Sequence, residues 1–178
     1  MISANDIREL RTASRDYETT QDLKQRLAEL RSDRTDFYLT SKDFDAILKW
    51  KLRGQYGRQS ERRLSNTDEI IRVVTRLAFS IEHEDKDYEV ELRIKILCSL
   101  RGVEVPVASA LLTLVFPDKY AVVDFRGWRQ IFSEDRNTFT VPQYRKYLAQ
   151  IRELAQDLGW LVQETDLAIW EYDFRMHG

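Results

Sequence analysis

The segment from Leu100 to Trp128 constrains the fold more than any other part of the 178-residue chain. Its sequence is LRGVEVPVASALLTLVFPDKYAVVDFRGW, in which a turn containing glycine precedes a long apolar run. Gly102 can adopt the positive φ that other residues avoid, so the chain can reverse direction there. Pro106 suits the first turn of a helix, where its missing N–H loses no hydrogen bond. We therefore expect one helix to end near Leu100 and a second, apolar helix to reach Phe116.

An acidic residue follows this predicted helix at the end of an extended apolar triplet. Asp124 stands after Ala121-Val122-Val123 and before Arg126-Gly127-Trp128. A carboxylate in such a place usually has a task or a partner. It can cap a short helix that begins near Phe125, which is what Asp most often does at a junction between a loop and a helix. Both roles are compatible, because a capping carboxylate at a helix start is also held in place for electrostatic work.

The order of these parts resembles the helix-hairpin-helix and Gly/Pro-loop-Asp core of the base-excision DNA glycosylase superfamily. Leu100, Gly102 and Val103 correspond to its hairpin, Ala108 to a small residue of the following helix, and Asp124 to its essential aspartate. About thirty of the 178 residues carry the resemblance. It implies an all-α, two-lobed helical domain in which Asp124 is catalytic. It also implies that the hairpin residues Gly102 and Val103 bind the DNA backbone, because exposed N–H groups at a tight turn can hold a phosphate.

Three residues depart from the family pattern. Arg101 replaces the hairpin proline, Glu104 replaces its second glycine, and Pro106 stands where bifunctional members keep the lysine that forms a Schiff base. Glu104 opposes phosphate binding by its charge, so an ordinary turn between two core helices is the alternative for the hairpin. Without an amine at position 106 we expect no strand cleavage. Lys51 or Lys119 could supply an amine from another element, although a lysine is more often a solvated surface charge.

The composition supports a single helical domain. Hydrophobic residues make up 43% and charged residues 33% of the chain, with only six glycines and three prolines, which is typical of a helix-rich globular protein. We expect an N-terminal helical extension over residues 1–36 and the glycosylase-like domain over residues 37–178. The helices of the extension either pack on the core or dock a protein partner. The net charge is −2, so any contact with DNA has to come from a local patch.

Apolar spacing and capping residues predict the remaining helices. One helix follows Thr40 or Ser41 and ends at Gly54, and the next runs from Asn66 or Thr67 to about Ile81. Ile70, Val73, Val74 and Leu77 are expected to form the buried stripe of the second of these helices. Further helices are expected over residues 88–100, from Thr140 to Leu158, and from Thr165 or Asp166 onward. In the last helix we expect Leu167, Trp170 and Phe174 to be buried and the acids Asp166 and Asp173 to lie on other faces.

The densest basic run supplies candidates for binding DNA. Residues 49 to 63 hold six Lys or Arg and one acid. An enzyme that acts on a base has to extrude it, and aromatic faces beside cations can then stack the base and hold the backbone. We therefore assign Trp50, Lys51 and Trp128 to a base pocket, and Arg53, Arg58 and Arg126 to the DNA backbone. Packing of the two Trp residues in the core, a solvated basic helix face, and pairing of Arg126 with an acid such as Glu134 are the alternatives.

Several classes of site and location are not expected. Cys98 is the only cysteine, so neither an internal disulfide nor a four-Cys iron–sulfur cluster can form. His83 and His177 are far apart in the sequence, and we expect no metal and no cofactor. No stretch reaches the roughly 18 apolar residues of a membrane span. The N-terminus has no signal region, so we expect a soluble, cytoplasmic protein.

Together these features predict a monofunctional DNA N-glycosylase-like protein that uses Asp124 to remove a damaged or modified base. The alternative is a catalytically inactive protein with the same fold that binds DNA or a protein partner. Glu104 and Pro106 motivate this alternative. A structure distinguishes the two in part, by showing whether Asp124 faces a cavity or is sealed off by neighbouring amides and cations.

Overall fold

The computed structural model describes residues 2–58 and 60–178, and these residues form helices and no β-strand. This confirms the all-α prediction. The α-helices are α1 (Ala4–Ile7), α2 (Tyr17–Asp33), α3 (Ser41–Leu52), α4 (Ser60–Leu64), α5 (Asp68–Ser80), α6 (Lys86–Leu97), α7 (Val105–Val115), α8 (Phe125–Phe132), α9 (Val141–Leu158) and α10 (Val162–His177), with short 3-10 turns at η1 (Arg8–Leu10) and η2 (Arg53–Gln55). Within this part of the chain, no helix has both the length and the hydrophobicity needed to cross a membrane.

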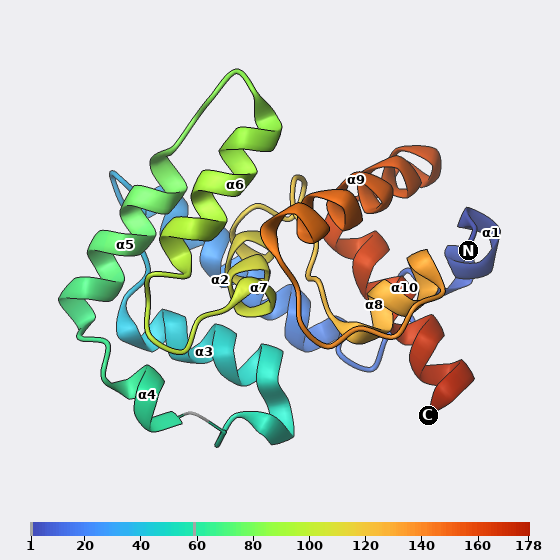
Figure 1. The fold of residues 1–178 in the computed structure, drawn as a ribbon, viewed down its shortest axis with the longest axis horizontal. Coiled ribbons are helices and arrows are strands. Elements are labelled where there is room, and N and C mark those ends of the chain that lie inside the picture. Colours follow the sequence, from blue (N-terminus) through green and yellow to red (C-terminus); the bar gives the residue numbers. More distant parts are fainter. Residues whose placement is uncertain (1, 59) are drawn as a thin grey trace.

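Helix α7 lies at the centre of the molecule, and α2, α3 and α6 pack against it (Figure 1). Val105 and all of the residues from 107 to 115 are buried. A helix that is apolar on every side is stable in water only when other elements surround it. The apolar run that dominates the sequence is therefore the helix around which the others are arranged.

The turn before α7 has the predicted conformation. Gly102 has a φ of +74°, and Pro106 lies in the first turn of α7. Glu104 is the N-cap residue with an extended φ of −110°, so the turn needs only one residue with positive φ. The backbone therefore accepts Glu104 in place of a second glycine without strain.

The C-terminal helix begins earlier than the sequence indicates. Helix α10 starts at Val162, and it packs against α8, α9 and α1. Because neighbours cover several of its faces, Asp166 and Asp173 are buried with 8% and 0% exposure, respectively. The prediction that Thr165 or Asp166 caps this helix is wrong, since the N-cap residue is Leu161, and the faces that carry the two acids are buried as well. Trp170 and Phe174, which we expected to be buried, are only partly buried.

Helix α5 is rotated relative to the prediction. Its buried residues are Ile71, Thr75, Ala78 and Phe79, whereas Ile70, Val73 and Leu77 are each about half exposed. The predicted buried stripe is therefore wrong for these three residues, whereas its fourth member, Val74, is partly buried against the core. Both faces of α5 carry apolar residues, so the spacing alone could not identify the inner face.

The N-terminal segment packs on the rest of the chain. Ile7, Leu10 and Leu27 belong to the main hydrophobic cluster, and the ammonium of Lys24 donates to Oε1 of Gln163 at 2.7 Å. The N–H of Ile2 donates to the carbonyl oxygen of Gln130 at 3.2 Å. The sequence left open whether this segment packs on the core or docks a protein partner. Packing on the core accounts for these apolar residues.

Candidate functional site

Asp124 is the N-cap residue of α8. Its Oδ1 accepts hydrogen bonds from the backbone N–H groups of Arg126 at 3.1 Å and Gly127 at 3.0 Å. The sequence places Asp124 there because an extended apolar segment ends where the helix starts, and Asp satisfies the free N–H groups of the first turn. The positive end of the helix dipole also favours a negative charge at this position. The capping interpretation of Asp124 is confirmed.

The second carboxylate oxygen of Asp124 faces Lys51, which comes from the last turn of α3. The Nζ of Lys51 lies 3.4 Å from Oδ2 of Asp124, and the two side chains are 12% and 20% exposed. The fold thus brings together a cation and an anion that are far apart in the sequence. Asp124 lines a cavity, and both of its carboxylate oxygens have partners, the two backbone amides on Oδ1 and Lys51 on Oδ2.

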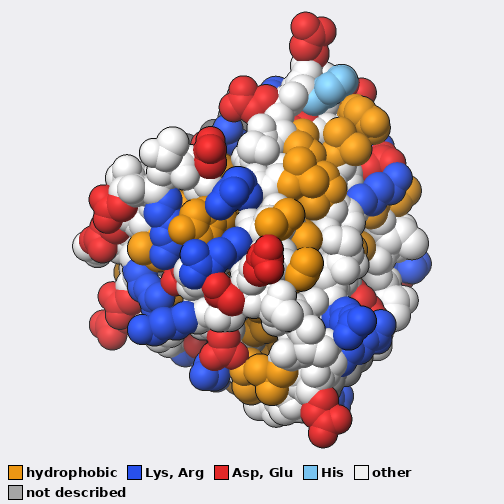
Figure 2. Space-filling view, turned by 90° about the vertical axis from the view of Figure 1, so that its left-hand side faces the viewer, with side chains coloured by type: hydrophobic (Ala, Val, Ile, Leu, Met, Phe, Trp, Pro, Cys, Tyr) orange, Lys and Arg blue, Asp and Glu red, His pale blue; other side chains and the backbone are white. Residues whose placement is uncertain are grey.

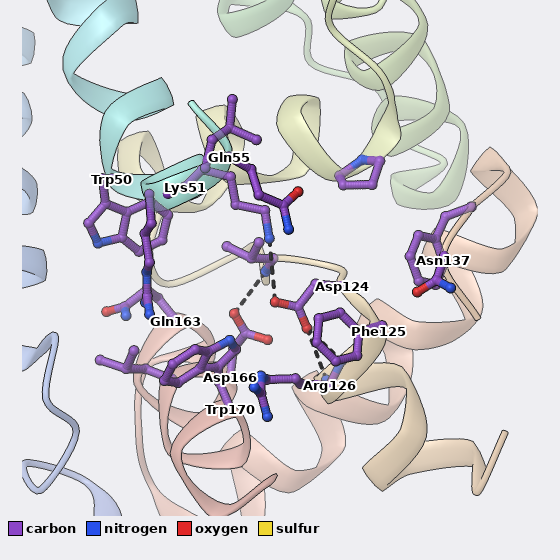
Figure 3. A pocket seen from close by; sticks show the side chains of 18 residues that line it. Trp50, Lys51, Gln55, Asp124, Phe125, Arg126, Asn137, Gln163, Asp166 and Trp170 are labelled. Atoms are coloured by element: carbon purple, nitrogen blue, oxygen red, sulfur yellow. Dashed lines mark hydrogen bonds and ion pairs between the residues drawn. The ribbon is translucent and has the colours of Figure 1, made fainter. Parts of the chain in front are cut away.

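This cavity has a volume of about 530 Å³ and is formed by three parts of the chain (Figure 3). The end of α3 with η2, the segment around the start of α8, and the first half of α10 supply most of the lining. The lining residues are Trp50, Lys51, Leu52, Arg53, Gly54, Gln55, Pro106, Val122, Asp124, Phe125, Arg126, Gly127, Asn137, Phe139, Gln163, Asp166, Leu167 and Trp170. Cavities of this size hold small molecules or a single extruded group of a larger ligand.

Asp166 is a second carboxylate in the cavity wall, and Figure 3 shows it beside Asp124 and Lys51. Its Oδ2 accepts the backbone N–H of Val122 at 2.9 Å, and its Oδ1 accepts the hydroxyl of Tyr147 at 2.7 Å. Burial, together with the negative charge of Asp124, raises the pKa of Asp166 to about 7, although both hydrogen bonds act in the opposite direction. The cavity therefore contains a carboxyl group that gains a charge near neutral pH.

Two of the residues assigned to a base pocket line the cavity. Trp50 and Lys51 do so, and the indole N–H of Trp50 donates to Oγ1 of Thr20 at 3.0 Å. Trp128 does not line the cavity and is only 3% exposed. It packs between Phe132, Phe139 and Tyr147 in the core, because this face of α8 points inward. This corrects the prediction that Trp128 contributes to the pocket.

Arg126 is held by a buried acid. Its Nη1 lies 2.9 Å from Oδ2 of Asp173, which also accepts hydrogen bonds from Arg129 and Gln130. Burial opposes the charged form of Asp173, but these three donors outweigh it and lower the pKa of Asp173. The acid that pairs with Arg126 is thus Asp173, not Glu134. Arg126 also lines the cavity, and its assignment to the DNA backbone stays a prediction.

The basic residues between positions 49 and 63 lie in different surroundings. Arg53 lines the cavity, with its guanidinium 4.3 Å from the ring centre of Trp170 and in an ion pair with Asp16. Arg58 is exposed and lies outside the cavity lining. Arg63 is 7% exposed and packs against the hairpin. The run therefore does not form one continuous solvated face.

The hairpin turn is covered by the segment around α4. A Cβ added to Gly102 would lie 2.6 Å from Cγ of Arg63, and Asn66 exchanges two 2.9 Å hydrogen bonds with the backbone of Arg101. Val103 is 4% exposed, and its N–H donates to the carbonyl oxygen of Leu100 at 3.1 Å. The Val103 amide is thus already bonded, which corrects its assignment to a DNA phosphate.

Most of the lining residues were not assigned to a site from the sequence, and four of them supply aromatic or polar groups from two helices. Phe125, Gln163, Asp166 and Trp170 come from α8 and α10, and they reach the cavity only because these helices pack on each other. Helix α10 is mostly buried although it has the polar residues Gln163, Glu164, Thr165 and Asp166 near its start. This run of polar residues is the one signal that could have pointed to Asp166. Four aromatic side chains, a lysine and two carboxyl groups give the cavity the means to hold a flat, polar group beside a fixed negative charge.

Comparisons with protein-family models, with curated proteins and with solved structures give no match to this chain. The description that its own residues support is an all-α protein with a polar and aromatic cavity at the N-terminus of α8.

Proposed function

We propose that this chain is a monofunctional DNA N-glycosylase-like protein that removes a damaged or modified base. The observation that carries the proposal is the position of Asp124, whose Oδ1 is fixed by two backbone amides while its side chain lines a cavity of about 530 Å³. A carboxylate held in this way needs little rearrangement to stabilise a positive charge that develops next to it.

The chemistry requires one anion close to the sugar. When the bond between C1′ and the base nitrogen breaks, its electron pair leaves with the base and positive charge spreads over C1′ and the ring oxygen. Asp124 stabilises this charge. Water then adds to C1′, and Asp124 accepts the proton that the water loses. The amides of Arg126 and Gly127 keep the carboxylate oriented throughout.

The cavity wall suits an extruded base. Trp50, Phe125 and Trp170 offer aromatic faces, and Gln55 and Asn137 offer amide groups that can donate and accept hydrogen bonds. A base taken out of the duplex is held by stacking and by hydrogen bonds to its edge. Arg53 and Arg58 follow Lys51 in the chain and are the proposed contacts to the DNA backbone.

We propose that strand cleavage is absent. Pro106 lines the cavity at the position where the resembling bifunctional enzymes keep their lysine, and it has no amine. Lys51 has an amine, but its Nζ contacts the carboxylate of Asp124. A protonated ammonium in an ion pair is not a nucleophile.

The proposed fold is the two-lobed helix-hairpin-helix arrangement, with residues 1–36 as an extension of the domain formed by residues 37–178. The supporting features are the reversal at Gly102 between α6 and α7, the cap at Asp124, and a cavity to which both α3 and α10 contribute.

One observation favours the inactive alternative, a module with this fold that binds DNA or a protein. Oδ1 of Asp124 accepts backbone N–H groups as a helix cap, and Oδ2 contacts the ammonium of Lys51. Both oxygens therefore have partners without any substrate. Covering of the hairpin by Arg63 points the same way.

Base release distinguishes the two functions. The full chain is incubated with duplexes that carry a panel of damaged and modified bases, and free base is measured by mass spectrometry. Asp124→Asn is the matched control, because Asn caps helices about as well as Asp and retains the fold of α8. Release that depends on Asp124 supports the glycosylase. Salt-dependent duplex binding that survives Asp124→Asn, without release of any base, supports the inactive module.

A further inference from the structure

The outer face of α5 carries an unpaired apolar line. Ile70, Val73 and Leu77 are 49%, 53% and 53% exposed. They follow one another at spacings of three and four residues, which places them on one side of a helix. Figure 2 shows a line of hydrophobic side chains on this side of the molecule, with basic and acidic side chains next to it.

This line is separate from the core and from the cavity. The inner face of α5 already packs through Ile71, Thr75, Ala78 and Phe79. No residue of α5 lines the cavity. Helix α5 also lies at the left edge of the molecule (Figure 1). The three apolar residues therefore lie outside the core cluster and the cavity and leave about half of their surface open to solvent.

Two exposed charges of opposite sign lie along one side of this line. With 100° between successive residues, Glu69 lies about 40° and Arg76 about 60° from Val73 in the same direction around the helix. Ile70 and Leu77 lie about 60° and 40° from Val73 in the opposite direction. Within the part of the chain that the structure describes, neither Glu69 nor Arg76 forms an ion pair. The guanidinium of Arg76 lies 5.0 Å from the ring centre of Tyr38.

We propose that this face of α5 binds the same face of a second copy of the chain, with the two α5 helices antiparallel and Val73 near the two-fold axis. In this arrangement the two-fold axis runs across the two helices near Val73, so each side of α5 faces the same side of the second copy, and positions three or four residues before Val73 lie close to positions three or four residues after it on that side. Ile70 then contacts Leu77 of the second copy, and Glu69 contacts Arg76 of the second copy. Each contact occurs twice, as an isologous interface requires.

The pattern identifies a second copy as the partner. On one side of Val73 the helix has an apolar residue before it and another after it, Ile70 and Leu77. On the other side it has an acid before Val73 and a base after it, Glu69 and Arg76. In an antiparallel pair, apolar residues of this face therefore meet apolar residues, and the acid meets the base. A surface that binds an unrelated protein has no need of such self-complementarity. A specific interface buries at least about 1,000 Å² in total. Leu64 on α4 and Tyr88 on α6, the helices before and after α5, are also exposed.

The oligomeric state of the full chain tests the proposal. Sedimentation equilibrium over a range from micromolar to submillimolar concentration is expected to show reversible association from the 21.2 kDa chain to a species of twice that mass. Val73→Glu places two like charges together near the axis and is expected to abolish association. Met176→Glu, at a 63% exposed position on α10, is the matched control and is expected to associate like the unchanged chain. A chain that stays monomeric throughout, or a Val73→Glu variant that still associates, overturns the proposal.

Charge reversal tests the arrangement of the two copies. Glu69→Arg and Arg76→Glu each bring like charges together twice per dimer, and each is expected to raise the dissociation constant about tenfold. The double variant exchanges the two charges and is expected to restore association. Since all of these positions are exposed, circular dichroism should show unchanged melting of the single chain. Failure of the double variant to recover rules out the antiparallel pairing.

Discussion

The buried carboxyl of Asp166 predicts how the stability of the protein depends on pH. Burial and the nearby charge of Asp124 raise the pKa of Asp166 from 3.8 to about 7. Between these two values the folded protein binds a proton that the unfolded chain has released. Stability therefore falls as pH rises from about 4 to about 7, and above that range this contribution no longer changes.

The size of the effect follows from the shift. A difference of about three pH units, at 1.36 kcal/mol per unit, corresponds to roughly 4 kcal/mol in the free energy of unfolding. About half of it, roughly 2 kcal/mol, is lost between about pH 5.5 and about pH 8. Such a loss is a large part of the stability of a domain of this size.

The comparison of the unchanged chain with Asp166→Asn isolates this contribution. Asn is neutral at every pH and can accept only one of the two hydrogen bonds from Val122 and Tyr147, so the variant is destabilised by a constant amount. The free energy of unfolding is measured for both proteins by urea denaturation at several pH values. The difference between the two proteins is expected to shrink by about 2 kcal/mol from about pH 5.5 to about pH 8. If both proteins lose stability in parallel over this range, Asp166 does not titrate there and the reasoning is refuted.

Three further changes test other parts of the site. Asp124→Ala removes the cap of α8 and is expected to cost about 1 kcal/mol in urea denaturation, whereas Asp124→Asn is expected to cost much less. Gly127→Ala would make a Cβ overlap the hydroxyl of Tyr147 and is expected to destabilise the protein by about 1–3 kcal/mol. The same variant should shift the titration of Asp166 upward, because the hydroxyl of Tyr147 lowers its pKa. Borohydride treatment with DNA containing an abasic site is expected to trap no covalent adduct, and an adduct that disappears in Lys51→Ala would show that Lys51 supplies the amine.

The sequence predicts those parts of the structure that local chemistry determines. Gly102, Pro106 and Asp124 each have one strongly preferred local role, and the structure shows all three roles at the expected positions. The all-α class and the central position of α7 follow in the same way, from the scarcity of Gly and Pro and from one continuous apolar run.

The sequence fails where tertiary packing decides. Helix α5 has apolar residues on two sides, so its periodicity does not tell which side faces the core, and Ile70, Val73 and Leu77 were assigned to the wrong one. Asp166 was expected at the start of the last helix, as a possible cap and on a different face from Leu167, Trp170 and Phe174. Its burial depends on Val122 and Tyr147, which come from distant segments and supply the hydrogen bonds that make burial tolerable.

The cluster around Asp173 determines the direction in which Asp124 points. Helix α8 has only eight residues, and a helix of that length does not persist alone in water. Arg126, Arg129 and Gln130 fasten three of those residues to a single carboxylate on α10. The C-terminal helix thus holds α8, and with it the carboxylate at its start, so substitutions at Asp173 should change the position of Asp124 although Asp173 does not itself line the cavity.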